Sequence, residues 1–221
     1  MQKAVAIVSG GLDSVTLAYL LRAEGYNLHL LSFDYGQRHR NELTYAELCA
    51  QRLEAEFSLL DLSTLGQFLK GSALTDDIPV PDGHYAAPSM AITVVPNRNA
   101  IMLSIAYGIA AAEEAEIVAI GVHSGDHFIY PDCRPEFIGA FSHMQKFALE
   151  GLGHPKLQLH APFLALGKHQ IVHLGHTLDV PFVDTWSCYK GGEKHCGTCG
   201  TCVERKEAFE LAGVPDPTIY Q

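Results

Sequence analysis

The stretch VAIVSGGLDSVTLAYLL, residues 5–21, decides the fold of this chain. Its apolar start leads through two glycines and an aspartate into an apolar segment of helical length, which predicts a strand, a tight turn and a helix. In a parallel sheet such a turn lies at the carboxyl edge, where free amides and the positive end of the helix favour an anion. Gly10 and Gly11 allow the backbone to approach phosphate oxygens, and Ser9 and Ser14 can add hydroxyl donors.

The same alternation of strand and helix continues along the chain. Strand-length apolar runs lie at 4–8, 28–33, 57–62, 117–121 and 157–163. Helical periods separate them, at 14–24, 41–55, 98–115, 134–150 and 167–177. Strands joined through helices require crossover connections, so we expect a doubly wound α/β fold, with a mostly parallel sheet and helices on both faces.

Two segments depart from that pattern and set the expected domain organisation. Residues 70–97 carry four prolines and two glycines, which predicts a long loop that serves as a lid or binds a ligand. After residue 184 the cysteines and glycines concentrate. We therefore expect an α/β domain at 1–184 and a small metal-binding segment at 185–221 that packs on it.

Composition narrows the class of protein. With 48% hydrophobic residues, the 221-residue chain can bury a real core. Its 15 Lys and Arg against 25 Asp and Glu give a formal charge of −10, which opposes a partner held through many phosphates, such as tRNA. The longest apolar stretch, 100–112, is shorter than the ~18 residues of a membrane span, and the N-terminus lacks a secretory pattern. We expect a cytoplasmic protein that binds neither membrane nor nucleic acid.

Cys188, Cys196, Cys199 and Cys202 form a second constellation. Two overlapping C-x2-C steps on a glycine-rich turn, with a fourth cysteine upstream, can direct four thiolates at one point, as tetrahedral Zn²⁺ requires. Four protein ligands leave zinc no open position, so the expected metal is structural. Disulfide bonds and an iron–sulfur cluster are the alternatives, although a cytosol keeps thiols reduced and nothing else indicates electron transfer. His195 is a possible substitute ligand.

The two other cysteines have different surroundings. Cys49 lies within a helical period and is expected to be a buried apolar residue. Cys133 lies in a polar segment beside Arg134, whose charge can lower the pKa of a thiol. A nucleophilic role for Cys133 is therefore a hypothesis.

The turn itself carries a specific signature, SGGLDS at 9–14. It is neither a Walker sequence nor a G-x-G-x-x-G fingerprint, which disfavours P-loop NTPases and dinucleotide oxidoreductases. Asp13 would repel bare phosphate, so we expect it to help hold a Mg²⁺ that bridges phosphates. The signature resembles that of the ATP pyrophosphatase, or PP-loop, superfamily, whose members cleave ATP between the α and β phosphates. The expected ATP-binding residues are Val8, Ser9, Gly10, Gly11, Leu12, Asp13 and Ser14.

Nearly the whole chain resembles the 7-cyano-7-deazaguanine synthase (QueC-type) family of queuosine biosynthesis. The motifs that carry this resemblance are SGGLDS at 9–14, FDYGQRH at 33–39, VPNRN at 95–99, GVHSGDHFIYPDCRPEF at 121–137, Lys168, and the cysteine-rich run at 187–202. The family converts 7-carboxy-7-deazaguanine, ammonia and two ATP into the nitrile, through an amide, and releases AMP and pyrophosphate. Its members are typically homodimers. The resemblance thus implies a carbon–nitrogen ligase that uses ATP with Mg²⁺ and holds a structural zinc.

The resemblance also suggests roles for single residues. Asp13, Lys168 and Arg98 are the expected catalytic residues, with Arg38 as a further cationic candidate. The expected substrate-binding residues are Asp126, Asp132 and Arg134, because a carboxylate can accept the N–H donors of a guanine-like edge and an arginine can bind the substrate carboxylate. Phe128 or Tyr130 is expected to stack on the base.

The chain departs from the family pattern at Asn97, at His123 and at 127–129, which concerns the substrate contacts rather than the ATP chemistry.

Two other functions remain as alternatives. A PP-loop tRNA-modifying enzyme, of the thiolase or lysidine synthetase type, needs a basic surface or an added RNA-binding domain. A non-catalytic nucleotide-binding module gives no reason for the 121–137 motif. The sequence shows no segment expected to release ammonia from glutamine, so we expect ammonium or a partner glutaminase to supply the nitrogen.

Overall fold

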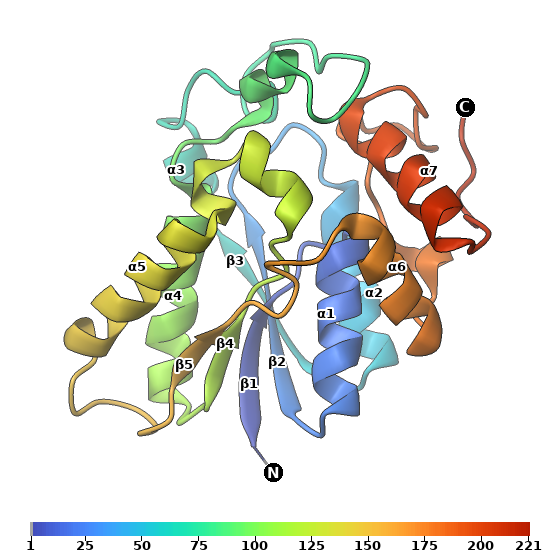
Figure 1. Ribbon diagram of the computed structural model, residues 1–221. Coiled ribbons are helices and arrows are strands. Elements are labelled where there is room, and N and C mark those ends of the chain that lie inside the picture. Colours follow the sequence, from blue (N-terminus) through green and yellow to red (C-terminus); the bar gives the residue numbers. More distant parts are fainter. Residues whose placement is uncertain (1) are drawn as a thin grey trace.

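A single parallel sheet organises the computed structural model, which describes residues 2–221 (Figure 1). Its strand order is β3-β2-β1-β4-β5, and every neighbouring pair is parallel. The strands are β1 (Lys3–Ile7), β2 (Asn27–Asp34), β3 (Glu56–Asp61), β4 (Ile117–Ala119) and β5 (Gln158–His160). The doubly wound α/β fold is confirmed.

Helices cover both faces of this sheet (Figure 1). They are α1 (Leu12–Ala23), α2 (Asn41–Arg52), α3 (Ser63–Gly66), α4 (Arg98–Ala112), α5 (Pro135–Ala148), α6 (Lys168–Thr177) and α7 (Gly200–Ala212). Short 3-10 turns are η1 (Pro88–Thr93), η2 (Ser124–Phe128), η3 (Pro131–Cys133) and η4 (Phe182–Asp184). Among these elements no helix is long and apolar enough to cross a membrane.

Two apolar cores lie on opposite faces of the sheet. One contains Leu17 of α1 and Ile171 of α6, both fully buried. The other contains Leu103 of α4 and Phe141 of α5. The central strand β1 supplies side chains to both cores in alternation, which explains why its sequence is apolar throughout rather than alternating.

The long loop predicted at 70–97 lies over the carboxyl ends of the strands (Figure 1). It contains η1 and is tied to the cysteine-rich segment, because Gly83 N donates to Thr198 O at 3.0 Å and Asp82 forms a β-bridge with Cys199. The loop therefore borders the edge of the sheet where ligands bind in open α/β folds.

The helix α7 was not predicted from the sequence. It begins directly after Cys199 and ends at Gly213, which has a φ of +66° that favours glycine. Fully buried Phe209 attaches it to the core formed with α6. The chain after residue 184 thus contains a helix packed on the domain as well as the cysteine-rich turn, and a domain boundary at 184 stays a prediction.

Candidate active site

The turn between β1 and α1 is held in shape by its own residues. Gly10 has a φ of +84°, and a Cβ atom there would lie 2.1 Å from the carbonyl oxygen of Glu42, so only glycine fits against α2. The Ser9 and Ser14 hydroxyls lie 3.1 Å apart, and the Ser14 hydroxyl also accepts the Ser9 N–H at 3.1 Å. Gly11, with an ordinary φ of −76°, leads into α1, whose first amides have no partner within the helix. The conformation of the turn is therefore fixed by its own hydrogen bonds and by its packing against α2.

This turn lies where the strand order reverses, between β1 and β4, which is the usual ligand site of open α/β sheets. Two adjoining cavities open there. The first is bordered by the turn, the end of β4, Asp126, Lys168 and residues of the cysteine-rich segment. The second lies toward the ends of β2 and α4. The residues that border both are Ile7, Ser9, Glu42, Arg98, Asn99 and Tyr189.

The predicted ATP-binding stretch follows these cavities closely. Ser9, Gly11, Leu12, Asp13 and Ser14 border the first cavity, and Val8 and Ser9 border the second. Gly10 borders neither, because it faces α2. Contact of these residues with ATP stays a prediction.

Lys168, at the start of α6, is the centre of an ion-pair cluster. Its ammonium group lies 3.1 Å from Asp13 Oδ2 and 2.7 Å from Glu204 Oε2. Burial lowers the pKa of Lys168, but the charges of Asp13, Glu204 and Asp126 outweigh burial and raise the pKa overall. Burial likewise raises the pKa of Asp13, and Lys168 with His123 more than reverses this, so the Asp13 pKa is lowered. The cluster therefore presents fixed charges to the first cavity.

His123 also contacts this cluster. Its Nδ1 accepts the Gly125 N–H at 3.1 Å, so in the neutral ring the proton is on Nε2. That nitrogen faces Asp13 at 3.8 Å and Asp126 at 3.6 Å. The His123 ring is 1% exposed. The histidine at which this chain departs from the family pattern is therefore buried and hydrogen-bonded.

Arg98 borders both cavities without a carboxylate partner in the described chain. Its Nη1 donates to the Tyr35 hydroxyl at 3.1 Å, and its guanidinium carbon lies 5.5 Å from the centre of the Tyr35 ring. Burial raises the pKa of Tyr35 to about 12, so its hydroxyl stays neutral. A guanidinium without a counterion beside a cavity is suited to bind an anionic ligand.

The three predicted substrate-binding residues occupy different places. Asp126 borders the first cavity. Asp132 accepts the backbone N–H of Asn99 at 2.9 Å, at the start of α4. Arg134 donates from Nε to His127 O at 2.9 Å, and neither it nor Asp132 borders a cavity. A substrate role for these residues stays a prediction, and the geometry favours Asp126.

The two residues expected to stack on the base, Tyr130 and Phe128, also occupy different places. Tyr130 borders the first cavity, and its hydroxyl lies 2.8 Å from that of Thr93 in the long loop. Phe128 is 75% exposed and borders neither main cavity. Arg38 binds Asp77 and Ile78 O of the long loop and also lies outside both cavities.

Cys133 borders the first cavity, but its surroundings do not favour the hypothesis that it is a nucleophile. The thiol is buried, and burial together with the charges of Asp126 and Asp132 raises its pKa. It accepts a hydrogen bond from the Asn99 amide at 3.2 Å. Arg134, the neighbour expected to activate it, points to His127 O instead. Cys133 therefore stays a neutral thiol.

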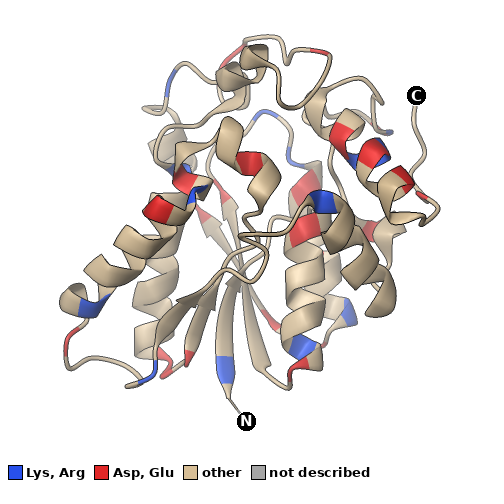
Figure 2. Cartoon of the chain, in the orientation of Figure 1, with Lys and Arg blue, Asp and Glu red and all other residues tan. Residues whose placement is uncertain are grey.

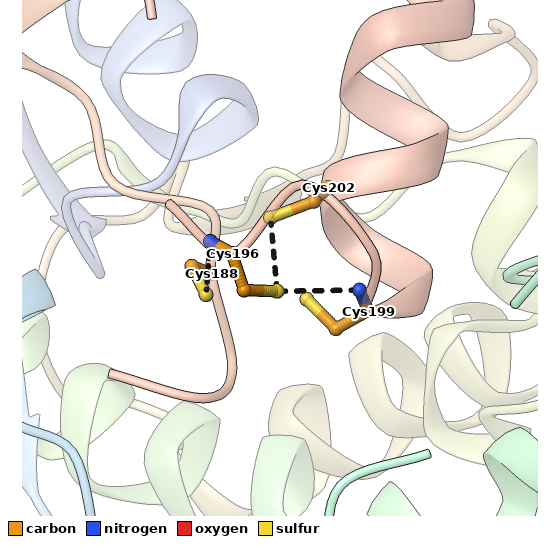
Figure 3. Close-up of side chains that lie close together, drawn as sticks. All are labelled: Cys188, Cys196, Cys199 and Cys202. Atoms are coloured by element: carbon orange, nitrogen blue, oxygen red, sulfur yellow. Dashed lines mark hydrogen bonds between the residues drawn. The ribbon is translucent and has the colours of Figure 1, made fainter. Parts of the chain in front are cut away.

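Four cysteines meet at one point, as their spacing predicts (Figure 3). The sulfur atoms of Cys188, Cys196, Cys199 and Cys202 all lie within 4.8 Å of one another. Backbone N–H groups donate to these sulfurs, from Cys196 to the Cys188 sulfur at 3.4 Å and from Cys199 to the Cys196 sulfur at 3.3 Å. The group can hold a metal ion.

His195 is not part of this group. Its Nε2 accepts the Ser187 N–H at 3.0 Å, and its ring packs on Trp186 with ring centres 4.3 Å apart. The substitute-ligand alternative is therefore wrong, since the nitrogen lone pair that would bind a metal is already used.

In the cartoon of Figure 2, backbone segments of Lys and Arg are interspersed with segments of Asp and Glu. This agrees with a formal charge of −10 for the whole chain. The Lys168 cluster is a local concentration of charge within this distribution.

Glu42 and Glu204 are cavity residues that the sequence did not reveal. Glu204 lies two positions after the last cysteine, in the helix that was missed, and reaches Lys168 only through the tertiary packing of α7 on α6. Glu42 lies five residues after Gln37, and its side chain accepts a hydrogen bond from that amide at 3.3 Å. An acidic residue in the first turn of a helix has the ordinary explanation of dipole stabilisation, so no local signal marked it.

Comparison with known proteins shows the family of this chain. A family model described as "Queuosine biosynthesis protein QueC" matches residues 3–213. A relative from Rhizobium rhizogenes, named 7-cyano-7-deazaguanine synthase, is 59% identical over 219 residues, 99% of this chain and 92% of its own. One of the same name from Brucella anthropi is 59% identical and is covered to 94%.

Solved structures share the fold. The NMN synthetase of Francisella tularensis is 17% identical, with a TM-score of 0.53, over 97% of this chain and 78% of that one. A predicted subunit of tRNA methyltransferase from Methanocaldococcus jannaschii is 19% identical, with a TM-score of 0.50, over 80% and 75%. These likenesses concern the fold alone. The near full-length sequence match carries the assignment: the chain belongs to the QueC family of queuosine biosynthesis proteins.

Proposed function

We propose that this chain is an enzyme that converts 7-carboxy-7-deazaguanine and ammonia into 7-cyano-7-deazaguanine, with ATP cleaved to AMP and pyrophosphate. The observation that carries the proposal is the Lys168 cluster facing the PP-loop turn in a member of the QueC family. The name shared by the curated relatives gives the reaction. Two adjoining cavities offer separate places for a nucleotide and a base-like acid.

The reaction needs ATP for a chemical reason. A carboxylate is a poor electrophile, and transfer of AMP to it creates an acyl adenylate with a good leaving group. Ammonia then displaces AMP and forms the amide. A second adenylation, on the amide oxygen, allows loss of AMP and formation of the nitrile. One ATP site serves both adenylations, because each transfers AMP to an oxygen at the same carbon.

The PP-loop turn supports binding of the departing pyrophosphate. The free amides at the start of α1 can donate to phosphate oxygens, and Gly11 leaves them open to the cavity. Lys168 and Arg98 can add cationic contacts to the charge that develops as the α–β bond breaks. These donors are fixed before the reaction, so they need no rearrangement during it.

Asp13 fits a Mg²⁺ ligand. Its Oδ2 pairs with Lys168, whereas its Oδ1 is buried and accepts no hydrogen bond from the described residues. A buried carboxylate oxygen without a partner is costly unless a cation or donor meets it, and Mg²⁺ prefers such oxygen ligands. Bound there, Mg²⁺ would neutralise phosphate charge.

For the deazaguanine acid we propose the first cavity. The Asp126 carboxylate can accept the paired N–H donors of the guanine-like edge, and the Tyr130 ring is placed to stack on the base. A substrate-binding role for Asp132 and Arg134 requires a movement of η3 toward the cavity, because neither residue borders it. Arg98 is the alternative partner for the substrate carboxylate.

The cysteine cluster we propose as a structural zinc site. Four sulfur ligands and N–H donors to the sulfurs suit tetrahedral Zn²⁺, and a full protein shell leaves no position for a substrate. The metal would fix the turn that leads into α7 and thereby place Glu204 beside Lys168.

We also propose that the enzyme is a cytoplasmic homodimer whose ligands are small molecules. Reduced thiols suit a zinc site in the cytoplasm. At the end of α5, Met144 is 48% and Phe147 is 68% exposed, and Leu152 after it is 63% exposed. Exposed apolar side chains close together in sequence support a contact with another subunit. Light scattering of the purified chain measures the mass directly.

Acid-dependent exchange of labelled pyrophosphate into ATP tests the function without ammonia. Formation of an acyl adenylate is reversible, so the exchange should appear only when ATP, Mg²⁺ and 7-carboxy-7-deazaguanine are all present. Exchange that ignores the acid, or none at all, would contradict the proposal. Guanine replaces the acid as the control, because it offers no carboxylate.

A further inference from the structure

One carboxylate where the two cavities meet has no part in the binding described above. Glu42 lies in the first turn of α2, and its side chain borders both cavities together with Ser9 and Arg98. Its backbone carbonyl is packed against Gly10, where a Cβ atom would approach it to 2.1 Å. The position of Glu42 is therefore fixed relative to the PP-loop turn.

The other carboxylates of the first cavity are engaged. Asp13 and Glu204 pair with the ammonium group of Lys168 at 3.1 and 2.7 Å. Asp126 accepts the backbone N–H of His123 at 3.4 Å and faces its ring at 3.6 Å. Each of these carboxylates thus already has a side-chain partner at the edge of the cavity, Lys168 for Asp13 and Glu204 and His123 for Asp126.

Glu42 differs from them in its partners. In the described chain its side chain accepts one hydrogen bond, from Gln37 Nε2 to Oε1 at 3.3 Å, and Oε2 accepts none. The Gln37 amide cannot turn over, because its Oε1 accepts the Tyr35 N–H at 2.9 Å while its Nε2 also donates to Phe33 O at 3.3 Å. One oxygen of Glu42 is thus held by a fixed donor and the other is free.

We propose that Glu42 accepts the proton released by the reacting nitrogen in the amide-forming and nitrile-forming steps; this rests on the proposed function. In the first step the nitrogen lone pair of ammonia forms the C–N bond. The C–O bond to AMP breaks with its electron pair on the phosphate oxygen, and one N–H proton passes to the Glu42 carboxylate. Two hydrogens remain on the amide, so the atoms balance. Glu42 then returns its proton to solvent.

The second step follows the same course. When the amide oxygen is adenylated and pyrophosphate leaves, the nitrogen loses one of its two protons to solvent, so the neutral adenylated amide carries one N–H. Glu42 takes that proton as the C≡N bond forms and AMP leaves with the electrons of the C–O bond. One carboxylate serves both steps because the nitrogen occupies the same place in each. No oxidant or reductant is required.

The electrostatic surroundings support this role. Burial raises the pKa of the Glu42 carboxyl to about 7, although Arg98 and the Gln37 amide act to lower it. The groups that face Glu42 are Gln37 from the β2–α2 connection, Arg98 from α4, and the neutral Tyr35 hydroxyl held by Arg98. A base whose pKa lies near the working pH is the most effective proton acceptor.

Glu42→Gln tests the proposal, because glutamine keeps an oxygen for the Gln37 amide but cannot take the proton. The matched control is Glu47→Gln, an exposed glutamate on the same helix. Three rates are measured: acid-dependent ATP–pyrophosphate exchange, amide and nitrile formation with ammonium, and product formation with hydroxylamine, a stronger nucleophile. Native exchange verifies the proposed function independently of Glu42.

In Glu42→Gln we expect exchange within threefold of native and ammonium-dependent product formation at least about 100-fold slower, the usual loss for a missing general base. Hydroxylamine should react with a loss of less than tenfold, and Glu47→Gln should be native in all three rates. The proposal is overturned if ammonium-dependent formation stays within tenfold of native, or if exchange falls as far as product formation. If native protein shows no exchange, the proposed function and this inference fall together.

Discussion

The ammonium group of Lys168 lies 2.7 Å from the Glu204 carboxylate, and this contact joins the cysteine-rich end of the chain to the cavity at the PP-loop turn. Both side chains are at most 12% exposed. Because Lys168 also meets Asp13 at 3.1 Å, the two carboxylates fix the direction in which its charge faces the cavity. The segment after residue 184 thus contributes Glu204 to the border of the first cavity.

Glu204→Gln should lower kcat about tenfold or more, which corresponds to ~1.4 kcal/mol, while metal content stays native. The amide can still accept a hydrogen bond from Lys168 but no longer balances its charge, so the ammonium group shifts toward Asp13. Steady-state kinetics and elemental analysis measure the two effects. Glu210→Gln, an exposed change on the same helix, is the control. An unchanged kcat in Glu204→Gln would show that Lys168 needs no such positioning.

Cys196→Ser should lose zinc, thermal stability and activity together, because the proposed zinc would hold the turn that begins α7. Cys133→Ala is the control, because the Cys133 thiol lies outside the cluster. This variant should keep its zinc, and native turnover in it would also show that the reaction does not use the Cys133 thiol. Elemental analysis, thermal melting and turnover are compared. A zinc-free variant that melts at the native temperature would refute a structural metal.

The two glycines of the PP-loop turn should respond differently to alanine. Gly10→Ala meets the Glu42 carbonyl at a positive φ and should destabilise the fold by at least about 2 kcal/mol. At Gly11 the φ of −76° suits alanine and the nearest atom to a Cβ lies 3.4 Å away, so Gly11→Ala should melt near the native temperature and bind ATP more weakly. Chemical denaturation and ATP titration distinguish the two. Equal losses of stability would contradict the packing described for Gly10.

Glu42→Gln should stabilise the protein at neutral and higher pH. Burial raises the Glu42 pKa from 4.5 to about 7, so the folded chain binds more protons than the unfolded chain between these values. This group therefore makes the fold less stable as pH rises from 4.5 to 7, by up to about 3 kcal/mol. Denaturation at pH 5 and pH 8 should show a gain from the variant at pH 8 that shrinks at pH 5. A gain that is the same at both values would mean that Glu42 does not titrate in this range.

Much of this structure follows from local patterns in the sequence. The strand, turn and helix of residues 5–21 were predicted because apolar strands buried on both faces and glycine turns have strong local signals. The cysteine cluster was predicted because ligand spacing is itself geometry. The weakest strands, β4 and β5, have three residues each, and their runs were predicted too long.

What escaped prediction depends on contacts between distant parts of the chain. The sequence of α7 is rich in charged residues, and its buried residues form no clear apolar pattern. The helix and Glu204 were therefore both missed. Glu42 is set apart only by its neighbours Gly10 and Gln37. Conversely, the sequence predicts that Arg134 binds the substrate, yet its guanidinium donates a hydrogen bond to the backbone carbonyl of His127.

Complete turnover with ¹⁵N-labelled ammonium tests the central claim most directly. Purified protein is incubated with ATP, Mg²⁺, labelled ammonium and 7-carboxy-7-deazaguanine, and the products are measured by mass spectrometry and nucleotide analysis. The account predicts a nitrile that carries one ¹⁵N, with two AMP and two pyrophosphate formed for each nitrile. ADP and phosphate in place of AMP, or ATP cleavage that leaves the acid unchanged, would contradict it.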